Sequence, residues 1–144
     1  MTDANPARIS YAEDSRFLRE LMSKRLRDRG YLIVGAPTGD AAAAALSEAA
    51  PPDILVTDIG MPGSLDGWGL ARLCRELHPG TGILYASSER PDSPLRVADS
   101  EFLPKPYGFE ALLAEVERLA SGRRCAAVLS PDLPPSGRAT SAPC

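Results

Sequence analysis

Three acidic residues and one lysine follow short apolar runs in this sequence, at positions where their side chains could meet. Asp58 comes directly after the apolar, β-branched run Ile54–Thr57. The pair Glu13-Asp14 follows a second such run near the N-terminus, and Lys105 follows a third. In an open parallel sheet the carboxyl ends of the strands are where ligands bind. We therefore expect a cluster of carboxylates with one ammonium group beside it.

A cluster of this kind predicts a divalent cation. Carboxylates that lie within a few ångströms repel one another, and one of them takes up a proton unless a cation intervenes. Carboxylate oxygens at a partly hydrated site suit Mg²⁺, which keeps several waters and uses one or two carboxylates. The alternative for Glu13-Asp14 is an N-cap pair before a helix that starts at Ser15. The other strand-end residues favour the metal over the cap.

The elements that position these residues alternate along the chain. Apolar spacing predicts strands at 9–12, 31–36, 54–57, 83–86 and 101–103, and helices at 15–29, 40–50, 66–77 and 109–120. Alternating strands and helices predict a parallel sheet with right-handed crossovers. Another helix is expected at 88–100, but Pro91 and Pro94 leave at most one turn near 95–99.

Taken together, these motifs resemble the receiver domain of two-component response regulators, over roughly residues 7–120. The resemblance rests on the run P-D-I-L-V-T-D-I-G-M-P-G-S-L-D-G, on the acidic pair, and on the strand end that carries Lys105-Pro106-Tyr107. It implies a flavodoxin-like, three-layer α/β sandwich with a five-stranded parallel sheet, here with a shortened fourth helix. The loop M-P-G-S-L-D-G also resembles that of stand-alone receivers.

The resemblance assigns a role to each strand-end residue. Asp58 would be the phosphoacceptor, a carboxylate that attacks phosphorus and becomes an aspartyl phosphate. Asp14 and Asp58 would bind Mg²⁺ directly, Glu13 would act through a water molecule, and the backbone carbonyl of Gly60 would be a further ligand. Lys105 would pair with the phosphoryl oxygens. Receivers commonly hold the peptide bond between this lysine and the following proline in the cis form.

Two further positions correspond to the residues that receivers use as switches. A serine or threonine hydroxyl at the end of the fourth strand moves to bond the phosphoryl group. Ser87 fits this position by strand register, and Ser88 is its rival. The aromatic switch position, three residues before Lys105, is Phe102. The alternative for Phe102 is an ordinary core aromatic of a strand.

The resemblance implies a stand-alone response regulator. It would accept a phosphoryl group on Asp58 from a histidine kinase or a histidine phosphotransfer protein, and it would signal through a changed surface. A downstream protein would bind the face of segment 88–100, the fifth strand and the last helix. We interpret the chain as a non-enzyme. Alternatives are a receiver that binds partners without phosphorylation, a phosphate sink in a relay, and a Mg²⁺-dependent phosphatase, which would need a second aspartate where Gly60 stands.

Composition limits the remaining possibilities. The net charge of -3 argues against a nucleic-acid-binding surface. The three widely spaced cysteines indicate free thiols in a reducing compartment. No apolar run approaches the about 18 residues of a membrane helix, and no signal-peptide core follows the N-terminus. We therefore expect a cytoplasmic protein that binds neither membranes nor nucleic acid, with a receiver domain at 1–120 and a proline-containing, disordered tail at 121–144.

Overall fold

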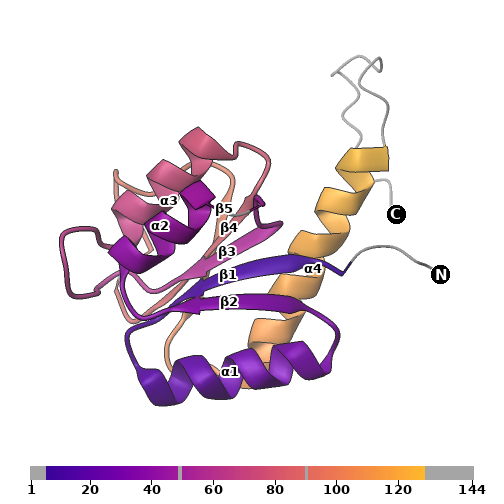
Figure 1. The fold of residues 1–144 in the computed structure, drawn as a ribbon, viewed down its shortest axis with the longest axis horizontal. Helices are drawn as coiled ribbons and strands as arrows, with labels where there is room; N and C mark the ends of the chain where they lie inside the picture. The colour runs from indigo at the N-terminus through magenta and orange to yellow at the C-terminus, as the bar shows by residue number, and fades with distance from the viewer. Residues whose placement is uncertain (1–5, 49, 90, 129–144) are drawn as a thin grey trace.

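The computed structural model describes residues 6–48, 50–89 and 91–128. Strands and helices alternate along these residues as the sequence pattern predicted (Figure 1). The strands are β1 (Arg8–Ala12), β2 (Leu32–Ala36), β3 (Ile54–Thr57), β4 (Gly82–Ser87) and β5 (Ser100–Pro104). The helices are α1 (Arg16–Asp28), α2 (Gly39–Glu48), α3 (Gly67–Leu77) and α4 (Phe109–Val128).

The strands form one sheet in the order β2-β1-β3-β4-β5, and every neighbouring pair is parallel. The predicted α/β fold with a five-stranded parallel sheet is confirmed. The order reverses beside β1, because β2 lies on one side of it and β3 on the other. In sheets of this type such a reversal opens a crevice at the carboxyl ends of the strands. The residues that follow β1 and β3 are therefore brought to the same place.

The core has two parts, one on each face of the sheet. On one face, α1 and α4 cover the strands through buried residues such as Leu26 and Leu112. On the other face, α2 and α3 cover them through residues such as Leu46 and Leu70 (Figure 1). All four residues of β3 are buried, as expected of a central parallel strand that is covered on both sides.

The connection between β4 and β5 departs from the regular alternation. The predicted shortening of its helix goes further in the structure, because the described part of 88–100 holds turns and no helix. Pro91 and Pro94 interrupt any helical hydrogen-bond ladder there. Arg96 instead ties the segment together. Its guanidinium donates to the Pro91 carbonyl at 3.3 Å and to the Oγ and carbonyl oxygen of Ser100 at 3.0 and 2.9 Å.

The last helix is longer than predicted. It ends at Val128, whereas the apolar spacing predicted an end at Ala120. The residues after Ala120 include arginine and alanine, which favour helix, and the next proline is Pro131. Residues 121–128 thus belong to α4, and the domain boundary at 120 with a disordered tail beyond it stays a prediction. Residues 129–144 lie outside the described part of the chain. Within the described residues, no helix has the length and apolar character that crossing a membrane requires.

Candidate functional site

Asp58 lies directly after β3, where the surrounding backbone fixes its carboxylate. Its amide donates to the carbonyl of Ala12 at 2.9 Å, which ties the end of β3 to the end of β1. Its Oδ1 accepts from the amide of Ile59 at 2.7 Å. Gly67 packs directly against this turn, because a Cβ there would lie 2.0 Å from the carbonyl oxygen of Asp58. Only glycine allows α3 to begin this close to the backbone of Asp58.

Glu13 and Asp14 follow β1 and differ in exposure. Glu13 is fully buried, and its Oε2 accepts from the amide of Ser15 at 3.0 Å. Asp14 is exposed. The N-cap of α1 is Ser15, whose Oγ accepts from the amide of Leu18 at 3.2 Å. The alternative in which Asp14 serves as the helix cap is therefore wrong, and its carboxylate is available for another role.

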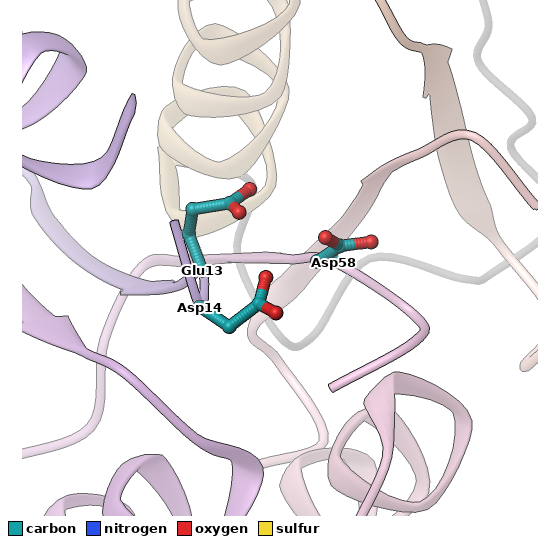
Figure 2. A group of neighbouring side chains, drawn as sticks. All are labelled: Glu13, Asp14 and Asp58. Carbon is teal, nitrogen blue, oxygen red and sulfur yellow. The ribbon is translucent and has the colours of Figure 1, made fainter. Parts of the chain in front are cut away.

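The three carboxylates meet as the sequence predicted. One oxygen from each of Glu13, Asp14 and Asp58 can be chosen so that all lie within 4.8 Å of one another. Figure 2 shows Glu13 and Asp14 approaching this point from the end of β1, and Asp58 from the end of β3. These are hard oxygen donors that share one edge of a sheet, so the donor set fits Mg²⁺.

Lys105 closes the cluster from the end of β5. Its Nζ lies 2.7 Å from Asp58 Oδ2 and 3.0 Å from Glu13 Oε1. The peptide bond between Lys105 and Pro106 is cis, as the resemblance to receiver domains implied. A single ammonium group therefore contacts both buried carboxylates, while the exposed Asp14 stands apart from it.

Comparisons with known proteins agree with this geometry. Residues 9–117 match the family described as the response regulator receiver domain. The chain belongs to this family. It is 32% identical over 121 residues to the response regulator protein FleR of Pseudomonas aeruginosa, and 32% identical over 128 residues to the transcriptional regulatory protein PdtaR of Mycobacterium tuberculosis. These matches cover 81% and 83% of the chain, but only 25% of FleR and 61% of PdtaR.

Solved structures of receiver domains share the fold. A response regulator receiver protein from Sinorhizobium medicae superposes with a TM-score of 0.77 at 32% identity, covering 82% of this chain and 97% of that one. The response regulator TrrA from Thermotoga maritima, solved in complex with Mg²⁺-BeF, superposes with a TM-score of 0.71 at 26% identity, covering 78% and 98%. The Mg²⁺-BeF complex is a property of TrrA, and it agrees with the acidic cluster in this receiver domain.

Burial and charge act in opposite directions on the titrating groups of this receiver domain. Burial raises the pKa of the Glu13 carboxyl, although the amide of Ser15 and the ammonium of Lys105 partly oppose this. Burial alone would lower the pKa of Lys105, but hydrogen bonds and charges from Asp58 and Glu13 outweigh it and raise that pKa. Lys105 therefore keeps its proton at neutral pH and supplies a permanent positive charge to the cluster.

The two serine candidates occupy different environments. Ser87 ends β4 and is buried, whereas Ser88 is exposed. The carbonyl of Ser87 accepts from the amide of Lys105 at 3.0 Å, so its backbone is joined to the residue that contacts Asp58. Its Oγ accepts from the amide of Glu89 at 3.2 Å. This environment favours Ser87 over Ser88 as the hydroxyl next to the site.

Phe102 lies at the edge of an aromatic group on the α3 side of the sheet. Its ring centroid lies 6.5 Å from that of Tyr85, which in turn lies 4.9 Å from that of Trp68. The Phe102 side chain is half-buried. It therefore packs from β5 against the core on this face of the sheet, through Tyr85 of β4.

Glu89 lies beside the site, and sequence reasoning missed it. A Cβ at Gly60 would lie 3.1 Å from Glu89 Oε2, so a fourth carboxylate stands beside the turn that follows Asp58. Glu89 is exposed and lies in the loop after β4. Its position two residues after the end of β4 is visible in the sequence, but such a position does not fix where the side chain of a loop residue points.

Proposed function

We propose that this receiver domain accepts a phosphoryl group on Asp58 in a Mg²⁺-dependent reaction. The observation that carries the proposal is the placement of Asp58 between the ammonium of Lys105, at 2.7 Å, and the carboxylates of Glu13 and Asp14. Receiver domains are signalling modules of two-component systems, and membership of this family supports the same role here.

The proposed donor is a phosphohistidine on a histidine kinase or a histidine phosphotransfer protein. A carboxylate oxygen of Asp58 forms a bond to phosphorus as the bond between phosphorus and the donor imidazole nitrogen breaks. The electron pair of that bond leaves with the imidazole. Before the transfer, the ammonium group of Lys105 pairs with the carboxylate of Asp58. After the transfer, the same ammonium group is close enough to pair with the phosphoryl oxygens bound to Asp58.

The residues proposed to hold Mg²⁺ are Asp14 and Asp58 directly, Glu13 through water, and the carbonyl of Gly60. The buried Glu13 carboxylate and the exposed Asp14 carboxylate present oxygens toward the same point as Asp58 (Figure 2). When bound there, Mg²⁺ would offset the negative charge that accumulates during phosphoryl transfer. The rest of the site orients Asp58 through the amide of Ile59.

The proposed output is a change of surface rather than a chemical conversion. Ser87 and Lys105 are joined through a backbone hydrogen bond, so a movement of either toward a phosphoryl group would act on β4 and β5 together. The loop between β4 and β5 begins directly after Ser87, and Phe102 lies in β5, the strand that follows it. We propose that this loop, β5 and α4 form the face that a downstream protein reads.

The test uses the full chain with Mg²⁺ and acetyl phosphate or phosphoramidate. We expect intact-mass analysis to show the gain of one phosphoryl group that hydroxylamine removes, as an acyl phosphate requires. Asp58→Asn abolishes this gain, whereas the matched control Asp28→Asn, on the exposed side of α1, keeps it. An equal gain in the Asp58→Asn variant would contradict the assignment. Phosphotransfer profiling against the histidine kinases of the host then identifies the donor.

A further inference from the structure

Strand β2 is the outer strand on one side of the sheet, and α1 runs beside it (Figure 1). The amide of Leu32 donates at 3.0 Å to the carbonyl of Ala7, just before β1. Backbone groups alternate between the two sides of a strand, so those of Ile33 and Gly35 point to the open side. The Ile33 carbonyl indeed accepts from the side chain of Arg27 at 3.1 Å. An open edge of this kind can pair with another extended chain.

Cationic side chains of α1 line one face of this edge. Arg19, Ser23 and Arg27 stand four residues apart, so they form one row along the helix. They border a groove of about 610 Å³ between α1 and β2. Gly35 lies opposite this row, and a Cβ there would contact the Arg19 side chain at 3.4 Å. The missing side chain at Gly35 therefore keeps the groove open along the strand.

The two arginines of this row have no carboxylate partner among the described residues. The Nη1 atom of Arg19 donates to the carbonyl of Glu13 at 2.7 Å, and Arg27 donates to the Ile33 carbonyl. A guanidinium has five N–H groups, so each arginine keeps donors for an anion. The hydroxyl of Ser23 lies between them, buried and without a hydrogen-bond partner.

The next row of side chains along α1 consists of residues that are already paired with an opposite charge. Lys24 pairs with Asp28 at 3.2 Å, and Glu20 pairs with Arg16 at 3.0 Å. Both pairs are exposed, and three of their four residues, Glu20, Lys24 and Asp28, also line the groove. The uncompensated positive charge of the groove is therefore concentrated on the inner row, next to the strand edge.

The opposite face of the same edge is apolar. The side chains of Leu32 and Val34 are 45% and 50% exposed, although both belong to a strand of the sheet. Beside Val34 lies a small hollow of about 40 Å³, which Leu46 and Pro52 also line, together with Arg8 of the adjacent strand β1. An added strand would thus meet positive charge on one of its faces and apolar side chains on the other.

We propose that the free edge of β2 binds an extended segment of a partner protein in which acidic and apolar residues alternate. Successive side chains of a strand point to opposite faces. The acidic side chains would therefore reach Arg19 and Arg27, and the apolar ones would cover Val34, while the main chain bonds to Ile33 and Gly35. A second copy of this chain fits less well, because its β2, L-I-V-G-A, brings no acid and would set the two arginine rows against each other.

The competing explanation is that Arg27 guards the edge. Proteins often place cationic side chains on edge strands to prevent pairing. The two explanations predict opposite effects of removing the guanidinium. If Arg27 recruits an acidic segment, Arg27→Gln weakens binding; if it guards the edge, the same substitution strengthens it.

The test uses a fluorescently labelled peptide of about seven residues, the length of an ordinary strand, in which glutamate and valine alternate. A peptide of the same composition with its glutamates and valines in two blocks is the control. We expect the alternating peptide to bind roughly tenfold more tightly than the block peptide, and to weaken as salt screens the charges. Arg27→Gln should weaken its binding roughly tenfold. Lys24→Gln is the matched control, because Lys24 already pairs with Asp28.

Hydrogen exchange supplies the readout specific to strand addition. The amides of Ile33 and Gly35 should gain protection when the alternating peptide binds, whereas that of Leu32, already bonded within the sheet, should not change. Circular dichroism confirms that each variant is folded. Equal binding of both peptides, tighter binding by Arg27→Gln, or unchanged exchange at Ile33 and Gly35 would overturn the proposal. So would a concentration-dependent dimer that Val34→Lys abolishes, since this would assign the edge to a second copy.

Discussion

The ammonium group of Lys105 contacts Asp58 at 2.7 Å and Glu13 at 3.0 Å, although these carboxylates come from different strands. Both carboxylates are buried, whereas the third member of the cluster, Asp14, is exposed. The chain therefore neutralises the buried part of its acidic cluster with its own cation. Mg²⁺ would add positive charge on the side where Asp14 meets solvent.

Replacing Lys105 with methionine should destabilise the protein when EDTA is present. The change leaves Glu13 and Asp58 buried without their shared cation, and the cost is on the order of 2–3 kcal/mol because Lys105 itself is partly exposed. Millimolar Mg²⁺ should recover part of this loss. Urea unfolding with and without Mg²⁺ measures both effects. An unchanged midpoint in EDTA would show that the ion pairs contribute nothing to stability.

Binding of Mg²⁺ should stabilise the wild-type fold by about 2.7 kcal/mol at a hundredfold excess over its dissociation constant. The reason is relief of repulsion among Glu13, Asp14 and Asp58. Asp58→Asn removes one of these charges, so it should raise stability in EDTA and reduce the effect of Mg²⁺. Thermal melts at several Mg²⁺ concentrations check this. A wild-type melting temperature that does not respond to millimolar Mg²⁺ argues against the metal site.

The stability of the metal-free protein should depend on pH through Glu13. Burial raises the pKa of its carboxyl above the ordinary value of 4.5. The bound proton therefore contributes stability that is full below about pH 4.5 and is lost as pH rises through the folded-state pKa. Glu13→Gln lacks this loss, so its stability relative to wild type should increase from pH 4.5 toward neutrality in EDTA. Thermal melts of the wild type and of Glu13→Gln across this pH range measure the effect. A difference in melting temperature between the two proteins that stays constant with pH would contradict the prediction.

Glu89 should strengthen the binding of Mg²⁺ without being essential to it. Its carboxylate lies beside Gly60, next to the proposed site, but it is exposed to solvent. Exposed charge pairs contribute about 0.2–1 kcal/mol, so Glu89→Gln should weaken Mg²⁺ affinity by up to roughly fivefold. Glu76→Gln, an equally conservative change at an exposed position of α3, is the control. Titration calorimetry measures the Mg²⁺ affinity of each variant. Equal affinities for Glu89→Gln and Glu76→Gln would place Glu89 outside the site.

The strand-end part of the site could be predicted because each residue follows a recognisable strand. Asp58 and Lys105 needed only the rule that parallel strands present their carboxyl ends at one edge. Glu89 had no such signal, because it stands in a loop where side-chain direction depends on tertiary contacts. The exposure of Asp14 was also beyond sequence reasoning, since it depends on Ser15 taking the cap of α1.

Helical periodicity located α1 but did not decide which of its apolar residues face the core. Leu18, Met22 and Leu26 contact the core, whereas Phe17 is 77% exposed and Leu21 is 38% exposed. Helical spacing alone would place all five of these residues on one broad face, because residues three or four positions apart are neighbours on a helix. The neighbouring helices and strands decide how much of this face is buried. The local sequence of α1 does not tell where those elements lie.

The tie that Arg96 makes within the connection from β4 to β5 bears on how this chain can diversify. A helix distributes its order over many backbone hydrogen bonds, so that no single side chain is indispensable to it. Here one guanidinium joins Pro91 to Ser100. Arg96 makes three of the hydrogen bonds that order this connection, so we expect its substitution to loosen the connection more than a change at the exposed Leu95 would. Changes at the exposed positions of this connection would alter the surface beside β5 and leave the strand pairing of the sheet as it is.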